Sequence, residues 1–409
     1  MRFAALSVAL VCGVSACSSS SPAKSEAPDD IVPVGSGDGG EPVSRDAAAP
    51  EDSSVAVGAV DGGPSLGTVP VPVVDVPDIA AVDVGGTGTE VTPAEPNGPL
   101  YDRLGSLGER HFAVSSDGLS FLTFGEGEPI SPVVPNVVTA AAEGNLIAAL
   151  AKSGTALSLQ RYTEHGVASG APATVAPSAD WQAVGVDATS TLVVWSHDAA
   201  LSGALMARGT ATMRPLDLGA TAAAGGTYAI QVVPSGAGFV VTWTRNRLDK
   251  RTETLWLRVG DDGSISSPTT VLLSTAGHAL VGASALPTGT ALLVNEGLPV
   301  VDSVVLRVDT DGKVTAITRL LGTSTAFGLA ANAAELGVVA ARQGHAVLRT
   351  LGADGAALGP FYVLDDAPVG GTFIPQSAVV TDGAGYAHLT HVKNGAAVFR
   401  RSDRTGLGL

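Results

Sequence analysis

The chain has 409 residues, and its 39 acidic residues outnumber 23 Lys and Arg to give a formal net charge of −16. Aromatic residues make up 4% of the sequence, and no basic cluster exceeds TRNRLDKR at 244–251. Nucleic-acid binding needs a basic patch, with interleaved aromatic residues where single strands are bound. The composition therefore argues against nucleic acid as a partner.

The first sixteen residues predict a signal peptide. Arg2 precedes an apolar run from Phe3 to Val14, which is too short for a membrane span and typical of secretion. The run ends in Val-Ser-Ala-Cys followed by serines, which resembles a bacterial lipobox. An ordinary signal peptide that happens to contain a cysteine is the alternative.

The lipobox resemblance implies that Cys17 carries lipid and becomes the new N-terminus. Several acyl chains on one residue make a membrane anchor effectively permanent. Ser18 then implies the outer membrane of a Gram-negative envelope, on its periplasmic side or at the surface. The other cysteine, Cys12, lies within the removed segment, so we expect no disulfide and no thiol site in the mature chain.

Residues 17–109 predict a lipid-anchored, disordered, acidic linker. Residues 18–97 include no aromatic residue, and their 14 acidic and two basic residues give a net charge of −12. Such a segment cannot bury enough apolar surface to offset its ordering entropy. In the valine-rich patch at 68–79, TVPVPVVDVPDI, prolines argue against a regular strand.

Residues 110–409 predict an all-β domain built from a repeat. Apolar strands rich in Val, Leu, Ala and Thr alternate with Gly, Asp and Ser turns, and an arginine recurs every 42–51 residues. A turn glycine follows most of these arginines, three times after aspartate (Asp262, Asp311, Asp354). The recurring arginines are Arg161, Arg208, Arg258, Arg307, Arg349 and Arg400. Repeats of this length are typical of four-stranded β-propeller blades.

Six arginine strands predict six blades. The last unit lacks an outer strand, and the piece at 111–134 is expected to complete it and close the ring; the alternative is a trimmed seventh blade. The Asp-Gly turns predict type I′ hairpins. We expect the arginines on half-exposed outer strands, and Trp195 and Trp243 as packing residues between blades.

The lipobox, the acidic tether and blades containing VVWS and RVDTDG together resemble propeller-bearing lipoproteins of predatory and soil-dwelling Gram-negative bacteria such as myxobacteria. The resemblance covers essentially the whole chain. Its motifs are structural, and it implies no assigned activity.

Motifs with a known chemistry are missing from the sequence. It contains no HExxH, no Walker loop, no GxSxG serine elbow and no GxGxxG following a strand; the GxSxG at 63–67 lies in the predicted linker. His388 and His391 lie three apart, so on a strand they point to opposite faces and do not share one metal ion. The aspartate turns lack the distal acid of a calcium loop. We therefore predict no metal, no cofactor and no catalytic residue.

The mouth of a central channel is the usual ligand site of a propeller, and loops between blades build it. The hypothesis is a non-enzymatic, membrane-anchored propeller that binds a protein, peptide or glycan there. The alternatives are an envelope polysaccharide hydrolase or lyase, and a structural component of the envelope. The candidate ligand-binding residues are Asp180, Trp181, His197, Asp198, Arg245 and Glu296.

Lipidation is testable by metabolic labelling with radioactive palmitate. We expect the wild-type protein to incorporate label and Cys17→Ala to lose it, because the lipidated sulfur is removed. Cys12→Ala is the matched control and keeps the label. Equal labelling of wild type and Cys17→Ala would exclude the anchor.

Overall fold

The computed structural model describes residues that all belong to one unit, Val57–Leu409. Every described segment is strand, turn or irregular chain, and none forms a helix able to cross a membrane. The expected signal peptide, Cys17 and the linker up to residue 70 lie outside the described residues. The structure describes residues 71–76, 82–83, 89–90, 101–107, 110–115, 118–122, 134–197, 200–210, 212–220, 227–275, 277–297, 302–321, 323, 325–332, 335–364, 377–381, 385–391 and 397–403.

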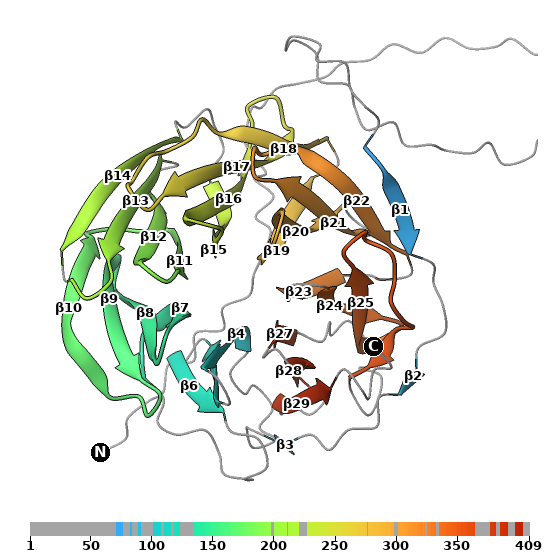
Figure 1. Ribbon diagram of the computed structural model, residues 1–409, viewed down its shortest axis with the longest axis horizontal. Coiled ribbons are helices and arrows are strands. Elements are labelled where there is room, and N and C mark those ends of the chain that lie inside the picture. The colour runs from blue at the N-terminus through green and yellow to red at the C-terminus, as the bar shows by residue number, and fades with distance from the viewer. Residues whose placement is uncertain are drawn as a thin grey trace, which may run out of the picture. The chain divides into compact units, whose positions relative to one another are not determined.

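The strands form seven sheets arranged as blades around a central axis (Figure 1). Six sheets follow the repeat, and in each the first strand of the unit lies innermost. The first three are β7–β10 (Val137–Glu143, Leu146–Ser153, Ala156–Thr163, Ala168–Ala176), β11–β14 (Trp181–Val186, Ser190–His197, Ala200–Ala207, Met213–Ala220) and β15–β18 (Thr227–Pro234, Gly238–Asn246, Thr252–Gly260, Thr269–Ser274). The next three contain β19–β22 (His278–Leu286, Gly289–Glu296, Asp302–Asp309, Val314–Leu320), β23–β26 (Thr325–Ala331, Glu335–Arg342, His345–Gly352, Tyr362–Val363) and β27–β29 (Ser377–Thr381, Gly385–His391, Ala397–Asp403).

The predicted all-β propeller is confirmed, and the six repeated units form six sheets of four or five strands. The piece at 111–134 does not complete the last of them. Instead β4 (Tyr101–Leu107), β5 (Arg110–Ser115) and β6 (Gly118–Leu122) form a three-stranded seventh sheet. This is the trimmed blade of the alternative prediction. It forms because β4 pairs along the length of β5 and gives this segment an innermost strand of its own.

Three short strands from the expected linker lie on the outer edges of successive sheets (Figure 1). β1 (Val73–Val76) pairs parallel with β22, β2 (Val82–Asp83) parallel with β26, and β3 (Thr89–Glu90) antiparallel with β29. The structure thus corrects two expectations: the sheets take up residues from 73 rather than 110, and the valine patch holds a strand. Its prolines precede and follow β1, so every N–H within the strand can bond.

The Asp-Gly turns differ in type from the prediction. Gly263 has a φ of 75°, but Asp262 before it does not take a positive φ. The Gly263 N–H donates to the Gly260 carbonyl over 2.8 Å, and Asp262 Oδ1 accepts the Ser264 N–H at 2.9 Å. Only the glycine is left-handed, which identifies a type I turn with a one-residue bulge rather than type I′. The carboxylate caps the turn.

The recurring arginines lie on or directly after the third strand of each sheet rather than on an outer strand, and some are buried. Arg307 is 9% exposed, and its Nη2 donates to the Gly352 carbonyl of the next sheet. Arg349 is fully buried, with its guanidinium carbon 4.6 Å from the centre of the Phe361 ring. Arg307 thus contacts the next blade, whereas Arg208 of the same series is exposed and donates to the Ala188 carbonyl of its own unit.

Trp195 and Trp243 pack between blades, as predicted. Trp243 is fully buried on β16, in a cluster with Leu192 and Val194 of the preceding sheet. Trp195 packs into the cluster that contains Leu157 and other residues of the β7–β10 sheet. Each sheet therefore shares its core with its neighbours.

The close approach of blades predicts that a methyl group at Gly337 destabilises the fold. A Cβ there would lie 2.3 Å from Cε1 of Tyr386, a fully buried ring on the next sheet. Gly337→Ala should lower the free energy of unfolding by about 1–3 kcal/mol, measured by urea denaturation. Gly282→Ala is the control, because its Cβ would meet its nearest neighbour at 3.5 Å; equal effects would contradict the packing described.

Candidate functional site

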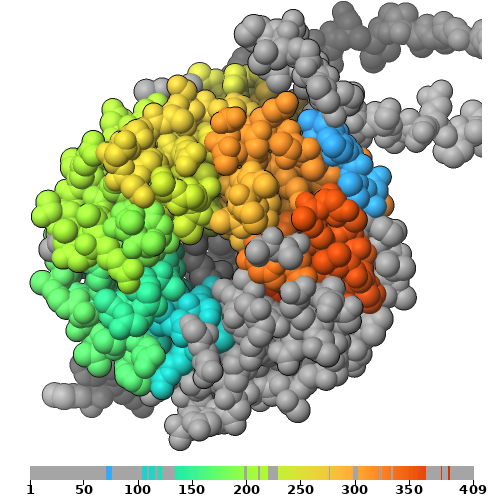
Figure 2. Space-filling view, viewed as in Figure 1, coloured from blue at the N-terminus to red at the C-terminus, as the bar shows by residue number. Residues whose placement is uncertain are grey.

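The innermost strands of all seven sheets surround a cavity of about 440 Å³ on the axis. The space-filling view shows the blades arranged around this central hollow (Figure 2). The described residues that line the cavity are Leu104, Ala140, Trp181, Gln182, Ala229, Ile230, Gln231, Leu280, Val281, Gly282, Ala283, Phe327, Gly328, Leu329 and Val379.

We call the end of the ring at which the innermost strands begin the mouth face. In the antiparallel register the first strand starts where the second ends, as in the pairs Trp181–Ser196 and His278–Glu296. The cavity lies between this face and the middle of the innermost strands, since it takes Trp181 from the very start of β11. The cavity therefore lies nearer to the mouth face than to the opposite end of the described innermost strands.

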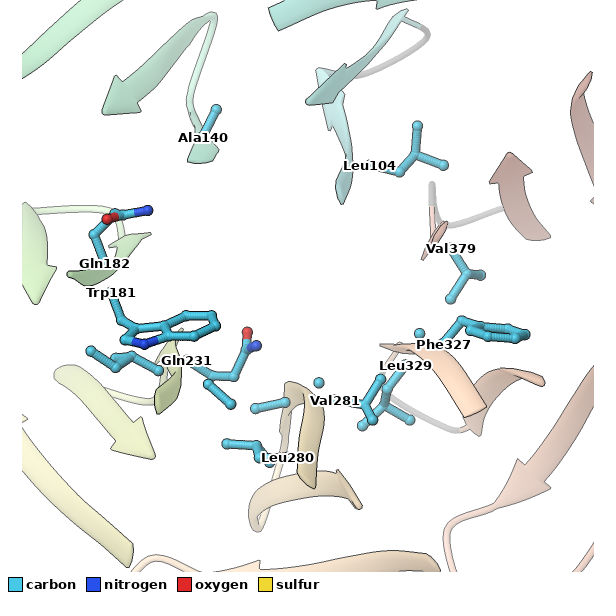
Figure 3. A pocket seen from close by; sticks show the side chains of 15 residues that line it. Leu104, Ala140, Trp181, Gln182, Gln231, Leu280, Val281, Phe327, Leu329 and Val379 are labelled. Atoms are coloured by element: carbon cyan, nitrogen blue, oxygen red, sulfur yellow. The ribbon is translucent and has the colours of Figure 1, made fainter. Parts of the chain in front are cut away.

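One side of the cavity carries its polar groups. Trp181 is 51% exposed, and its indole extends over the cavity beside the amides of Gln182 and Gln231 (Figure 3). Gln182 Oε1 is buried and has no hydrogen-bond partner among the described residues. An aromatic ring with two amides can stack on a ligand and exchange hydrogen bonds with it.

The opposite side is apolar. Leu104, Val379, Phe327 and Leu329 lie across the cavity from Trp181 (Figure 3). Phe327 is the extra residue of a β-bulge, because Ala326 pairs with Ala340 and Gly328 with Val339. Bulges re-aim a side chain, and the Phe327 ring packs against the cluster that contains Val379 and Tyr386 while contributing to the cavity wall.

Among the described residues that line the cavity, no side chain is charged. An ion that leaves water needs a charged or hydrogen-bonding partner to offset its desolvation. The described lining offers an ion only the amide and indole groups of Gln182, Gln231 and Trp181 as polar side-chain partners.

Two predicted residues, Asp180 and His197, meet near Trp181. Asp180 Oδ2 lies 3.6 Å from His197 Nδ1, and Ser178 Oγ lies 3.1 Å from the same nitrogen. Both side chains of the pair are about half exposed. A Ser-His-Asp triad needs the serine and the aspartate on different ring nitrogens, so this group does not have the geometry of a hydrolase.

Arg245 and Glu296 lie on the mouth face but do not line the cavity. Arg245 Nε pairs with the buried carboxylate of Glu253, which also accepts the Thr270 hydroxyl at 3.2 Å. This ion pair holds the basic hairpin to its own sheet. Asp198 and Cys17 lie outside the described residues.

Sequence reasoning missed Gln182 and Gln231. They lie 49 residues apart (231 − 182), one repeat of the chain, at positions where the following unit has Leu280. A polar residue at an innermost-strand position that is apolar in other units was the available signal. Phe327 gave no such signal, because its place depends on a bulge.

Among the described residues, no three His, Cys, Asp or Glu side chains are grouped to hold a metal ion. The acidic turns use their oxygens internally: Asp309 Oδ1 accepts the N–H groups of Asp311 and Lys313, both at 2.9 Å. A hairpin cap accounts for this aspartate.

No protein family matches the sequence, and a comparison with curated proteins finds no match. Among solved structures, the chain is similar to hydrazine synthase of Kuenenia stuttgartiensis, with a TM-score of 0.51 and 11% identity over 73% of this chain and 95% of that one. A streptogramin B lyase structure matches with a TM-score of 0.48 and 12% identity, over 77% of this chain and 97% of that one. At this identity the likeness shows the fold alone: the chain is a β-propeller.

Buried His278 at the mouth face predicts a pH-dependent stability. It is 7% exposed, its Nε2 lies 2.8 Å from Thr254 Oγ1, and burial lowers its pKa from 6.5 to about 4. Below pH 6.5 the unfolded chain therefore binds a proton at His278, whereas the folded chain does not bind this proton until the pH approaches 4. Stability is lost as the pH falls from 6.5 to 4, by about 1.4 kcal/mol per pH unit and about 3 kcal/mol in all.

Urea denaturation of wild type and His278→Asn at pH 7, 6 and 5 measures this effect. The wild type should lose about 2 kcal/mol more than the variant between pH 7 and 5. Parallel pH profiles would show that His278 does not stay neutral in the fold.

Proposed function

We propose that this protein is a non-enzymatic, lipid-anchored β-propeller that binds a ligand of the cell envelope in the mouth of its central channel. The anchor and the envelope location rest on the lipobox at Cys17. The propeller fold comes from the structure and supplies the channel.

The observation that best supports a binding function is the half-exposed Trp181 side chain at the cavity. A large aromatic side chain that is half exposed at the opening of a cavity keeps apolar surface in water. Covering it with a ligand recovers that free energy, and Trp is enriched among residues that dominate binding. The buried, unpartnered Oε1 of Gln182 beside it supplies an acceptor for the ligand.

An enzymatic function is less well supported by the mouth face. The Ser178 and Asp180 side chains approach the same ring nitrogen of His197, and the described residues of the cavity wall include no acid or base. General acid–base chemistry needs titratable groups within reach of the ligand.

The binding function predicts a strong effect of Trp181→Ala. On an array of blocked peptides and neutral oligosaccharides, the detergent-solubilised full chain should bind at least one probe saturably, and the variant should bind it about 30-fold more weakly, which corresponds to about 2 kcal/mol. Leu248→Ala is the control, because Leu248 is 80% exposed on a mouth-face hairpin outside the cavity.

Mass spectrometry of the bound probe separates binding from turnover. Recovery of the intact probe agrees with a binding protein, whereas release of a cleaved product would show an enzyme. Equal affinities of wild type and Trp181→Ala for every bound probe would place the site elsewhere.

A further inference from the structure

We infer that the ligand is an uncharged peptide segment, which inserts an apolar side chain into the channel while its backbone pairs with the amides of Gln182 and Gln231. The inference rests on the proposed function, since it names the ligand class of the same mouth. It chooses a peptide over a glycan from the distribution of polar and apolar groups around the cavity.

The polar side matches a peptide group. A glutamine side chain presents the same N–H donor and C=O acceptor as the backbone. Gln182 is on β11 and Gln231 on β15, and these innermost strands are neighbours in the ring. Both amides face one side of the cavity (Figure 3), and Gln182 Oε1 is available to accept a backbone N–H.

The apolar side excludes a sugar and suits a side chain. A sugar carries hydroxyl groups around its whole ring, so those turned toward Leu104, Phe327 and Leu329 would be buried without partners. Each buried, unpaired hydroxyl costs binding free energy. A Leu, Ile, Val or Phe side chain instead gains from contact with that wall.

The size of the cavity sets how much of the ligand enters. About 440 Å³ is near the lower end of the range for ligand pockets. The cavity therefore holds the side-chain end of a peptide rather than a whole folded partner. Trp181, half exposed at the rim, covers the backbone that stays outside.

A library of blocked pentapeptides, acetyl-Gly-Gly-X-Gly-Gly-amide with X varied over the natural residues, tests the inference by calorimetry on the full chain. Peptides with X as Leu, Ile, Val or Phe should bind at least tenfold more tightly than those with X as Asp or Lys. Chitotetraose, a neutral oligosaccharide, should not bind.

Variants assign the contacts. Gln182→Ala and Gln231→Ala should each lower the affinity for the apolar peptides at least fivefold. Ala140→Phe, which fills the cavity, should abolish peptide binding while the melting temperature stays close to that of the wild type. Leu321→Ala is the matched control, because Leu321 is 40% exposed in the β22–β23 connection on the mouth face and does not line the cavity.

The outcomes separate this inference from the proposed function. Chitotetraose binding that is lost in Trp181→Ala would overturn the peptide assignment and leave a binding propeller. Peptide binding that survives Ala140→Phe would overturn the insertion of a side chain. If neither probe class binds, both proposals fail.

Discussion

Packing between neighbouring sheets is the constraint on which this structure depends. Trp243 shares a cluster with Leu192 of the preceding sheet, and Arg307 donates across a blade boundary to the Gly352 carbonyl. A blade cannot bury its faces alone, so the ring must close. It closes through the three-stranded β4–β6 sheet, whose innermost strand lies between β27 and β7.

The candidate site follows from the same packing. Seven sheets that pack side by side bring their innermost strands to one axis, where the remaining space is a cavity rather than a filled core. Small residues and bulges then decide its shape: Gly282 and Gly328 widen it, while bulge residues Val281 and Phe327 form its wall. Its chemistry comes from the few polar side chains at these positions.

The repeat made the propeller predictable, because residues that pack alike in each blade recur at the blade's period. The period identifies equivalent residues but not their strand, which is why the arginines were expected on outer strands. Strands β1–β3 span only two to four residues and pair with the outer edge of an existing sheet. Segments this short do not show the alternation of apolar and polar residues by which a strand is recognised in a sequence. Trp181 was predictable as an exposed aromatic in a loop, but Gln182 and Gln231 meet only once the ring has formed.

The central claim is that a ligand enters the channel at Trp181. The chain has four tryptophans, so ¹⁹F NMR of protein labelled with 5-fluorotryptophan gives a small set of signals, which Trp181→Phe assigns. On saturation with an apolar blocked peptide, the account predicts that the Trp181 resonance shifts while those of Trp243 and Trp256, both almost fully buried, do not. A Trp181 resonance that stays unchanged at saturation would contradict it.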